Sequence, residues 1–202
     1  MFWLIVLAVL ACIIYVAIKR SRLRASISHL PETFIVFDLE TTGLDCERHE
    51  IIEIGAIRVS RDSTTHVTFQ TLVRPTKRIP ALITNKTGIT QTMVDSDGVP
   101  LDQAVREFIG FIGDSRLVAF NADFDMGFIR CAAAKQNLAI SNQVSCALKM
   151  ARRAFPGRRS YRLDDLSADG NLGTDGAHRA LKDSERALIV YASAAARLGT
   201  LA

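Results

Sequence analysis

The feature that most constrains the fold of this 202-residue chain is an apolar run that ends in two acidic residues. Phe34-Ile35-Val36-Phe37 lies between Pro31 and Gly43 and leads directly into Asp38-Leu39-Glu40. Such a run, bounded by proline and glycine, predicts a buried β-strand. Side chains two residues apart on a strand point to the same face, so Asp38 and Glu40 are expected to converge.

Two carboxylates crowded at the end of a core strand repel each other and resist loss of water unless a positive charge lies between them. A divalent metal ion resolves this conflict, and hard oxygen ligands favour Mg²⁺ or Mn²⁺. The simpler alternative is a strand that ends in an ordinary polar turn. The acidic pair alone does not decide between the two.

Two further segments add candidate site residues. Asp125 closes the segment Asn121-Ala122-Asp123-Phe124-Asp125, which follows the short apolar run 117–120. His178 precedes Asp183 by five residues at the start of an Ala-rich helical pattern. Each residue has a plainer alternative: Asp125 could cap a helix, His178 could lie on the surface, and Asp183 could pair with a neighbouring Lys or Arg.

With these motifs in this order, the chain resembles the DEDDh 3′→5′ exonucleases, the family of the proofreading epsilon subunit of DNA polymerase III and of ribonuclease T. The "DLETTG" motif of the family corresponds to Asp38 and Glu40, and its "NAxFD" motif to Asp125. The histidine that precedes an aspartate by five residues corresponds to His178 and Asp183. The resemblance covers roughly residues 33–198.

Shorter segments between the motifs strengthen the resemblance. Residues 51–56 are similar to the second strand of the family, residues 87–90 to its "TGIT" turn and residues 161–166 to its "YxLxxL" helix. One position departs from the family pattern, because Phe120 stands where a histidine usually precedes "NAxFD". An apolar residue at a strand end indicates core packing, and it leaves the five site residues unchanged.

The resemblance implies that Asp38, Glu40, Asp125 and Asp183 hold two divalent ions, Mg²⁺ or Mn²⁺. Two ions about 4 Å apart can activate a water molecule, neutralise the phosphate and stabilise the leaving 3′ oxygen. His178 would be the general base, because the unperturbed pKa of histidine lies near working pH. By the same resemblance, Thr41 and Leu44 would contact the terminal nucleotide, and the products would be nucleoside 5′-monophosphates.

The apolar patterns predict an α/β domain with a mixed five-stranded sheet and helices on both faces, which is the ribonuclease H-like fold that the resemblance implies. Strands are expected at 34–39, 51–59, 66–73 and 116–120, with a fifth around 140–144. Helix and turn signals fall at 79–94, and helices are expected at 101–112, 123–137, 144–154, 162–168 and 178–198.

Residues 1–18 contain no charged side chain, and Lys19, Arg20, Arg22 and Arg24 follow at once. Eighteen helical residues span about 27 Å, close to the ~30 Å hydrocarbon thickness of a bilayer. Basic residues after a span favour the cytoplasmic side. We therefore expect a single-pass anchor at 1–18, a basic juxtamembrane segment and linker at 19–32, and an exonuclease domain at 33–202 on the cytoplasmic side, with the bacterial inner membrane as the expected location. A cleaved signal peptide and a buried core helix are the alternatives.

The charge distribution limits how the chain can attract nucleic acid. The formal net charge is +4, but residues 1–24 hold four basic and no acidic residues, so the remainder holds 21 of each. A nucleic-acid footprint must therefore be local. The best candidate is the basic segment 149–162, with Arg158 and Arg159 as expected contacts to substrate phosphates. A solvated helix face and loop is the equally open alternative.

The expected partner is nucleic acid, as a single strand or a frayed 3′ end, while protein partners stay open. Two other functions compete with a membrane-anchored exonuclease: a non-catalytic module that tethers nucleic acid or a polymerase, and a proofreading subunit. A membrane span counts against the last, because a replicative complex travels along DNA. The four cysteines, Cys12, Cys46, Cys131 and Cys146, lack CxxC spacing and are expected to be free thiols in a reducing compartment.

Overall fold

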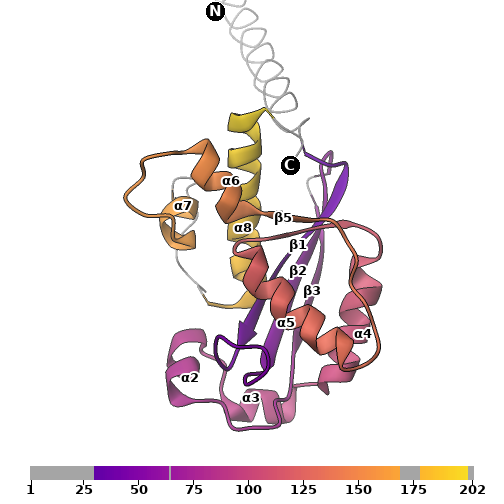
Figure 1. Ribbon diagram of the computed structural model, residues 1–202. Coiled ribbons are helices and arrows are strands. Elements are labelled where there is room, and N and C mark those ends of the chain that lie inside the picture. Colours follow the sequence, from indigo (N-terminus) through magenta and orange to yellow (C-terminus); the bar gives the residue numbers. More distant parts are fainter. Residues whose placement is uncertain (1–29, 64, 169–177, 200–202) are drawn as a thin grey trace, which may run out of the picture.

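The structure is a computed structural model that describes residues 30–63, 65–168 and 178–199 (Figure 1). Its strands are β1 (Thr33–Thr41), β2 (Ile51–Ser60), β3 (Val67–Leu72), β4 (Arg116–Ala119) and β5 (Val144–Cys146). Its helices are α2 (Ala81–Thr87), α3 (Gln91–Ser96), α4 (Leu101–Ile112), α5 (Ala122–Ala134), α6 (Ala147–Ala154), α7 (Leu163–Ala168) and α8 (Ala180–Leu198).

The five strands form one mixed sheet in the order β3-β2-β1-β4-β5. Strands β1, β2 and β3 pair antiparallel as a meander, whereas β4 is parallel to β1 and β5 is parallel to β4. Strand β1 is therefore central, and its carboxyl end lies at the same edge of the sheet as that of β4. The predicted mixed five-stranded sheet is confirmed.

Alternating side chains of β1 belong to two separate hydrophobic cores. Ile35, Phe37 and Leu39 pack in a cluster with α4 and α5. Phe34 and Val36 pack in a second cluster with α6 and α8. This period of two is what a strand covered on both faces requires, and Figure 1 shows the helices on either side of the sheet.

Two boundaries differ from the sequence expectation. The fifth strand begins at Val144, and Ile140 instead lies buried in the first core cluster. Helix α6 begins only at Ala147, because residues 144–146 pair with β4. The helix and turn signals at 79–94 separate into α2 and α3. Gly88, in the left-handed region at φ 71°, ends α2, and the Thr90 side chain caps α3.

The chain reaches β1 through a segment that already packs against the domain. Leu30 is buried in the second core cluster, and its carbonyl oxygen accepts a hydrogen bond from Arg61 Nη1 at 2.9 Å. No helix within the described residues is long and apolar enough to cross a bilayer. The expected anchor at 1–18 lies outside the described residues and stays a prediction.

Candidate active site

The carboxyl end of β1 carries the first two acidic residues of the site. Asp38 and Glu40 are opposite Gly55 and Glu53 on β2, and the register between these strands shifts after Glu40. This irregularity ends the regular pairing, and the chain turns beyond it. The Thr41 hydroxyl donates to the carbonyl oxygen of Gly43 at 2.6 Å, which stabilises that turn.

Asp125 reaches the same point from the first turn of α5. Its Oδ1 accepts a hydrogen bond at 3.2 Å from the backbone N–H of Leu39, the residue between the two acidic residues of β1. The side chain is buried. Because β4 is parallel to β1, the helix that follows β4 begins at the edge of the sheet where β1 ends. The sequence motif "NAxFD" therefore places its last aspartate against β1.

Helix α8 brings Asp183 to this site because its first turn lies directly on β2. A Cβ atom at Gly55 would overlap the backbone nitrogen of Leu181, so only glycine permits this approach. The Ser184 hydroxyl also donates to the carbonyl oxygen of Gly55 at 3.1 Å. Since Gly55 is the partner of Asp38 in the β1–β2 register, the start of α8 lies beside Asp38.

His178 precedes α8 and has a left-handed backbone with φ 62°, which is uncommon for a residue other than glycine. Its backbone N–H donates to Asp183 Oδ2 at 3.2 Å, so the acidic residue fixes the turn that carries the histidine. A ring nitrogen of His178 and carboxylate oxygens of Glu40 and Asp183 lie within 4.8 Å of one another. The three motifs, far apart in sequence, thus meet in one place.

Burial raises the pKa values of all four carboxyl groups, and repulsion from neighbouring carboxylates raises those of Asp38 and Glu40 further. The pKa of Asp38 lies well above its ordinary value, first because of burial and then because of Asp125 and Glu40. Burial and the charge of Asp183 raise the pKa of Glu40 to about 8. Burial raises the pKa of Asp125 to about 7, against the opposing effect of the Leu39 hydrogen bond. Burial also raises the pKa of Asp183, and Arg186 partly offsets this rise.

A cluster of this kind suits divalent cations. Four converging carboxylates supply the hard oxygen donors that Mg²⁺ and Mn²⁺ prefer. At neutral pH their mutual repulsion disfavours full ionisation, and a cation between them would relieve it. The chemistry of the donor set therefore fits the metal ions that the sequence implied.

Comparison with known proteins assigns the family. Residues 35–191 match the family model described as exonuclease, RNase_T. The chain belongs to this exonuclease family. Enzymes of this DEDDh group use two divalent metal ions, in agreement with the carboxylate cluster.

The exonuclease is 37% identical over 156 residues to DNA polymerase III subunit epsilon of Aquifex aeolicus, a match that covers 77% of this chain and 76% of the relative. It is 35% identical over 158 residues to PolC-type DNA polymerase III of Caldanaerobacter subterraneus, covering 78% of this chain but only 11% of that polymerase. Among solved structures, exonuclease X in complex with 5′-overhanging duplex DNA is 26% identical with a TM-score of 0.60, and the match covers 79% of this chain and 90% of that one.

Two buried charged groups that support the site were not singled out from the sequence. Arg186 is 2% exposed, and its Nη1 donates to Asp183 Oδ1 at 2.9 Å and to Asp164 Oδ1 at 3.3 Å. The sequence signal for this ion pair was that Arg186 follows Asp183 by three residues in a predicted helix. Glu53 is completely buried. The sequence signal for its role was that it is the one charged residue within the apolar run 51–57.

Glu53 fixes the start of α8 from the sheet. Its carboxylate accepts hydrogen bonds from Arg179 Nη2 at 2.6 Å, from the Ala180 backbone N–H at 2.9 Å and from Gln70 Nε2 at 2.9 Å. Arg179 directly follows His178 in the chain. The buried glutamate therefore holds the segment that presents the histidine, without belonging to the five predicted residues.

The predicted substrate contacts lie outside the carboxylate cluster proper. Leu44 is 86% exposed on the loop after β1, where an apolar side chain can pack against a nucleotide. Arg158 donates to the carbonyl oxygens of Ser160 at 3.4 Å, in its own loop, and of Asp165 at 3.3 Å, in α7, and Arg159 is exposed. Phe120 packs against the second core cluster, which confirms its expected core role.

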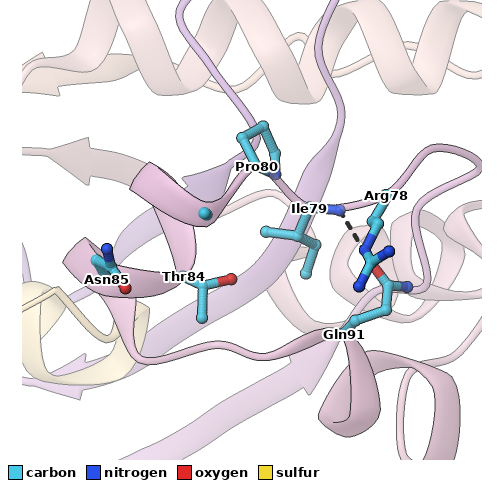
Figure 2. A pocket seen from close by; sticks show the side chains of 7 residues that line it. Arg78, Ile79, Pro80, Thr84, Asn85 and Gln91 are labelled. Atoms are coloured by element: carbon cyan, nitrogen blue, oxygen red, sulfur yellow. Dashed lines mark hydrogen bonds between the residues drawn. The ribbon is translucent and has the colours of Figure 1, made fainter.

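Two adjoining pockets extend along the loop after β1 and helix α2. A pocket of about 420 Å³ begins at Thr42 and also borders Arg48, His49 and Lys77. Arg78 and Pro80 are shared with a second pocket of about 580 Å³ (Figure 2). In that pocket Thr84 and Asn85 of α2 lie opposite Gln91, whose Oε1 accepts a hydrogen bond from the Ile79 N–H at 3.0 Å. The sequence did not reveal this basic surface, because Arg48 and the pair Lys77-Arg78 lie in separate segments that the fold brings together.

Proposed function

We propose that this chain is a metal-dependent 3′→5′ exonuclease that releases nucleoside 5′-monophosphates from the 3′ end of DNA or RNA. The observation that carries the proposal is the meeting of His178, Glu40 and Asp183 beside Asp38 and Asp125. A histidine next to a buried carboxylate cluster provides a base and a metal site together. This combination fits hydrolysis of a phosphodiester bond.

Asp38, Glu40, Asp125 and Asp183 would hold two ions, with Mg²⁺ or Mn²⁺ favoured by the oxygen donors. When bound, the ions supply Lewis-acid activation of the attacking water and neutralise charge on the phosphate and the leaving 3′ oxygen. Asp38 is central among the acidic groups, because the other three each raise its pKa. Asp125 is oriented by the Leu39 N–H, and Asp183 by Arg186.

His178 would take the proton of the attacking water as general base. The bond from its backbone N–H to Asp183 fixes the turn that carries it, and the Arg179–Glu53 pair fixes the residue that follows it. The imidazole is thereby kept close to the acidic groups.

The terminal nucleotide would lie against Thr41 and Leu44, at the turn that follows Glu40. From there the strand could follow the pocket with Arg48, Lys77 and Arg78, whose cations suit the phosphate backbone. Arg158 and Arg159 are the second proposed backbone contact, on the loop between α6 and α7. Both surfaces can bind a single strand or a frayed 3′ end.

We also propose, from the sequence of residues 1–24, that the enzyme is anchored in the bacterial inner membrane with its exonuclease domain on the cytoplasmic side. An uncharged stretch of 18 residues followed by four cations supports this arrangement. The second candidate function is service as a proofreading subunit of a polymerase. The 37% identity to DNA polymerase III subunit epsilon favours that candidate.

The deciding experiment uses the full chain in detergent with DNA and RNA oligonucleotides, each with a free or a chemically blocked 3′ end. We expect products one nucleotide long from free 3′ ends, dependence on Mg²⁺ or Mn²⁺, and loss of activity in excess EDTA. Asp38→Asn should lower turnover by several orders of magnitude while the domain stays folded. Equal degradation of blocked and free 3′ ends would disprove the proposed direction.

A further inference from the structure

A second cluster of metal-binding side chains lies apart from the carboxylate site. Cys46 and Glu47 are neighbours on the loop after β1, and Cys131 lies on α5. One ligand atom from each residue, the two sulfurs and a carboxylate oxygen, lies within 4.8 Å of the other two. The Cys131 thiol donates to the carbonyl oxygen of Cys46 at 3.5 Å and to Glu47 Oε1 at 3.6 Å.

We propose that Cys46, Glu47 and Cys131 form a binding site for a thiophilic divalent cation of the zinc class. The site shares no residue with the proposed Mg²⁺ or Mn²⁺ site. It also differs from that site in donor chemistry, because two of its three ligands are sulfur.

The donor set and its spacing both suit such an ion. Zinc accepts thiolate at about 2.3 Å and carboxylate oxygen at about 2.0–2.2 Å, usually with tetrahedral geometry. Ligand atoms around a tetrahedral ion are then roughly 3.5–3.8 Å apart, within the 4.8 Å separation found here. Sulfur donors select zinc over magnesium, so the two sites would take different ions from the same solution.

The surroundings allow an ion to enter and to be held. Both cysteines are half-buried and Glu47 is exposed, so solvent can deliver the ion and water can occupy a fourth position. The loop is also ordered before any ion binds. Asp45 Oδ1 accepts the Glu47 N–H at 3.0 Å, and the carbonyl oxygen of Asp45 accepts the His49 N–H at 2.8 Å.

A simple redox pair explains the cluster less well. A disulfide between Cys46 and Cys131 would use two of the three side chains and leave the carboxylate of Glu47 without a role. The observed contact between that carboxylate and the Cys131 sulfur is what a three-ligand site requires. Both cysteines are free thiols in the structure.

An ion at this position would join two segments that carry site residues. The loop that holds Cys46 follows Glu40 and bears Leu44, and the helix that holds Cys131 begins with Asp125 in its first turn. Binding would therefore clamp the loop after β1 onto α5. Glu47 also borders the pocket with Arg48 and Lys77, so the same ion would fix one wall of that pocket.

The test is a Cd²⁺ titration of the reduced, metal-free full chain in detergent, followed by the ultraviolet charge-transfer band of cadmium bound to thiolate. Carboxylates give no such band, so the readout ignores the other metal site and does not depend on activity. We expect the band to saturate at one equivalent and an excess of Zn²⁺ to displace Cd²⁺. Cys46→Ser and Cys131→Ser should each weaken binding by more than about 100-fold.

Matched controls separate the site from the other thiols. Cys12→Ser and Cys146→Ser should both retain the band, and Glu47→Gln should weaken Zn²⁺ binding while it retains both thiols. Circular dichroism establishes that each variant is folded. Absence of the band in the reduced wild-type protein, or its persistence in Cys46→Ser and Cys131→Ser, would overturn the proposal. So would a Cys46–Cys131 disulfide that forms equally in protein prepared with and without zinc.

Discussion

His178 is positioned through its backbone, and this determines what its removal should do. The bond to Asp183 comes from the backbone N–H of residue 178, which any residue except proline retains. His178→Ala therefore removes the imidazole and leaves the turn and the acidic residue in place. We expect turnover to fall by about 10²–10⁴-fold, the usual contribution of a general base, with much smaller changes in metal affinity. Single-turnover kinetics and Mn²⁺ titration measure the two effects, and a wild-type rate across pH 6–9 would exclude His178 as the base.

Arg186 offers a second test at the level of one side chain. It is buried and pairs with Asp183, so Arg186→Met should leave that carboxylate without its cation. Breaking a buried pair by removing one partner costs about 3–5 kcal/mol. Urea unfolding should show a loss of this size, whereas Arg153→Met on the exposed face of α6 should change stability by less than about 0.5 kcal/mol. Similar stability of the two variants would contradict the structural role of the Arg186–Asp183 pair.

The five proposed reactive residues could be predicted because motif order and spacing in the chain identify them. Arg186 and Glu53 could not, because their roles depend on which partners the fold brings to them. The structural role of Glu53 depends on its ion pair with Arg179, which is 126 positions away in sequence. Arg158 shows the reverse case. Its charge suggested a phosphate contact, but in the structure its guanidinium group also bonds to backbone carbonyls of its own loop and of α7.

At the level of elements, the close approach of α8 to β2 is the contact that assembles the site. Gly55→Ala would place a methyl group onto the backbone of Leu181, which cannot move aside as a flexible side chain could. We expect the first turn of α8 to shift, the domain to lose about 1–3 kcal/mol of stability, and turnover to fall because Asp183 and His178 move with the helix. Gly110→Ala on α4 is the matched control, since nothing lies within 4 Å of its added methyl. That variant should be neutral or slightly stabilising, and equal behaviour of the two variants would contradict the role assigned to α8.

Most elements could be predicted from apolar periodicity, because long amphipathic segments and strands bounded by glycine or proline give strong patterns. The fifth strand begins at Val144, the last position of the segment 140–144 that the pattern predicts. It is only three residues long, and its position depends on pairing with β4 rather than on any local pattern. Helix α6 begins at Ala147 rather than at 144 for the same reason. Short edge elements of this kind are selected by the neighbouring strand.

At the scale of the whole molecule, the carboxylate cluster should couple stability to pH and to metal. The folded pKa values of Glu40 and Asp125 are about 8 and 7, above the values of about 4 expected in the unfolded chain. Between about pH 4 and pH 8, the metal-free folded state therefore keeps protons on these carboxyl groups that the unfolded state releases. The contribution of these groups to stability is complete below about pH 4 and is lost as pH rises toward 8.

Thermal melts in EDTA between pH 5 and 9 test this coupling. The melting temperature should fall as pH rises, by roughly 2–4 °C for each kcal/mol lost. Mg²⁺ or Mn²⁺ should restore it, most strongly near pH 8, because the ions bind the ionised carboxylates. Asp38→Asn removes one of the repelling charges, so both the pH slope and the metal response should be smaller. A metal-free melting temperature that rises with pH in the wild type, with no difference in the variant, would argue against the coupling.

The proposed membrane anchor makes a prediction for the complete chain. Deletion of residues 1–24 should leave an active exonuclease in the soluble fraction, because every proposed site residue lies beyond them. Fractionation after sedimentation, with activity measured in both fractions, checks this. Recovery of the full-length chain as a trimmed, exported protein would reverse the proposed topology.

The burial of Leu30 limits how far the catalytic domain of such an anchored enzyme could extend from the membrane. With Leu30 fixed to the domain, only residues 25–29 would remain between the basic segment and the folded body. Five residues extend at most about 18 Å, less than the ~30 Å hydrocarbon thickness of the bilayer itself. The folded domain would then stay close to the membrane surface. There it could bind only those 3′ ends that come near the membrane. Its substrate range would depend as much on which nucleic acids reach that surface as on what the site can cleave.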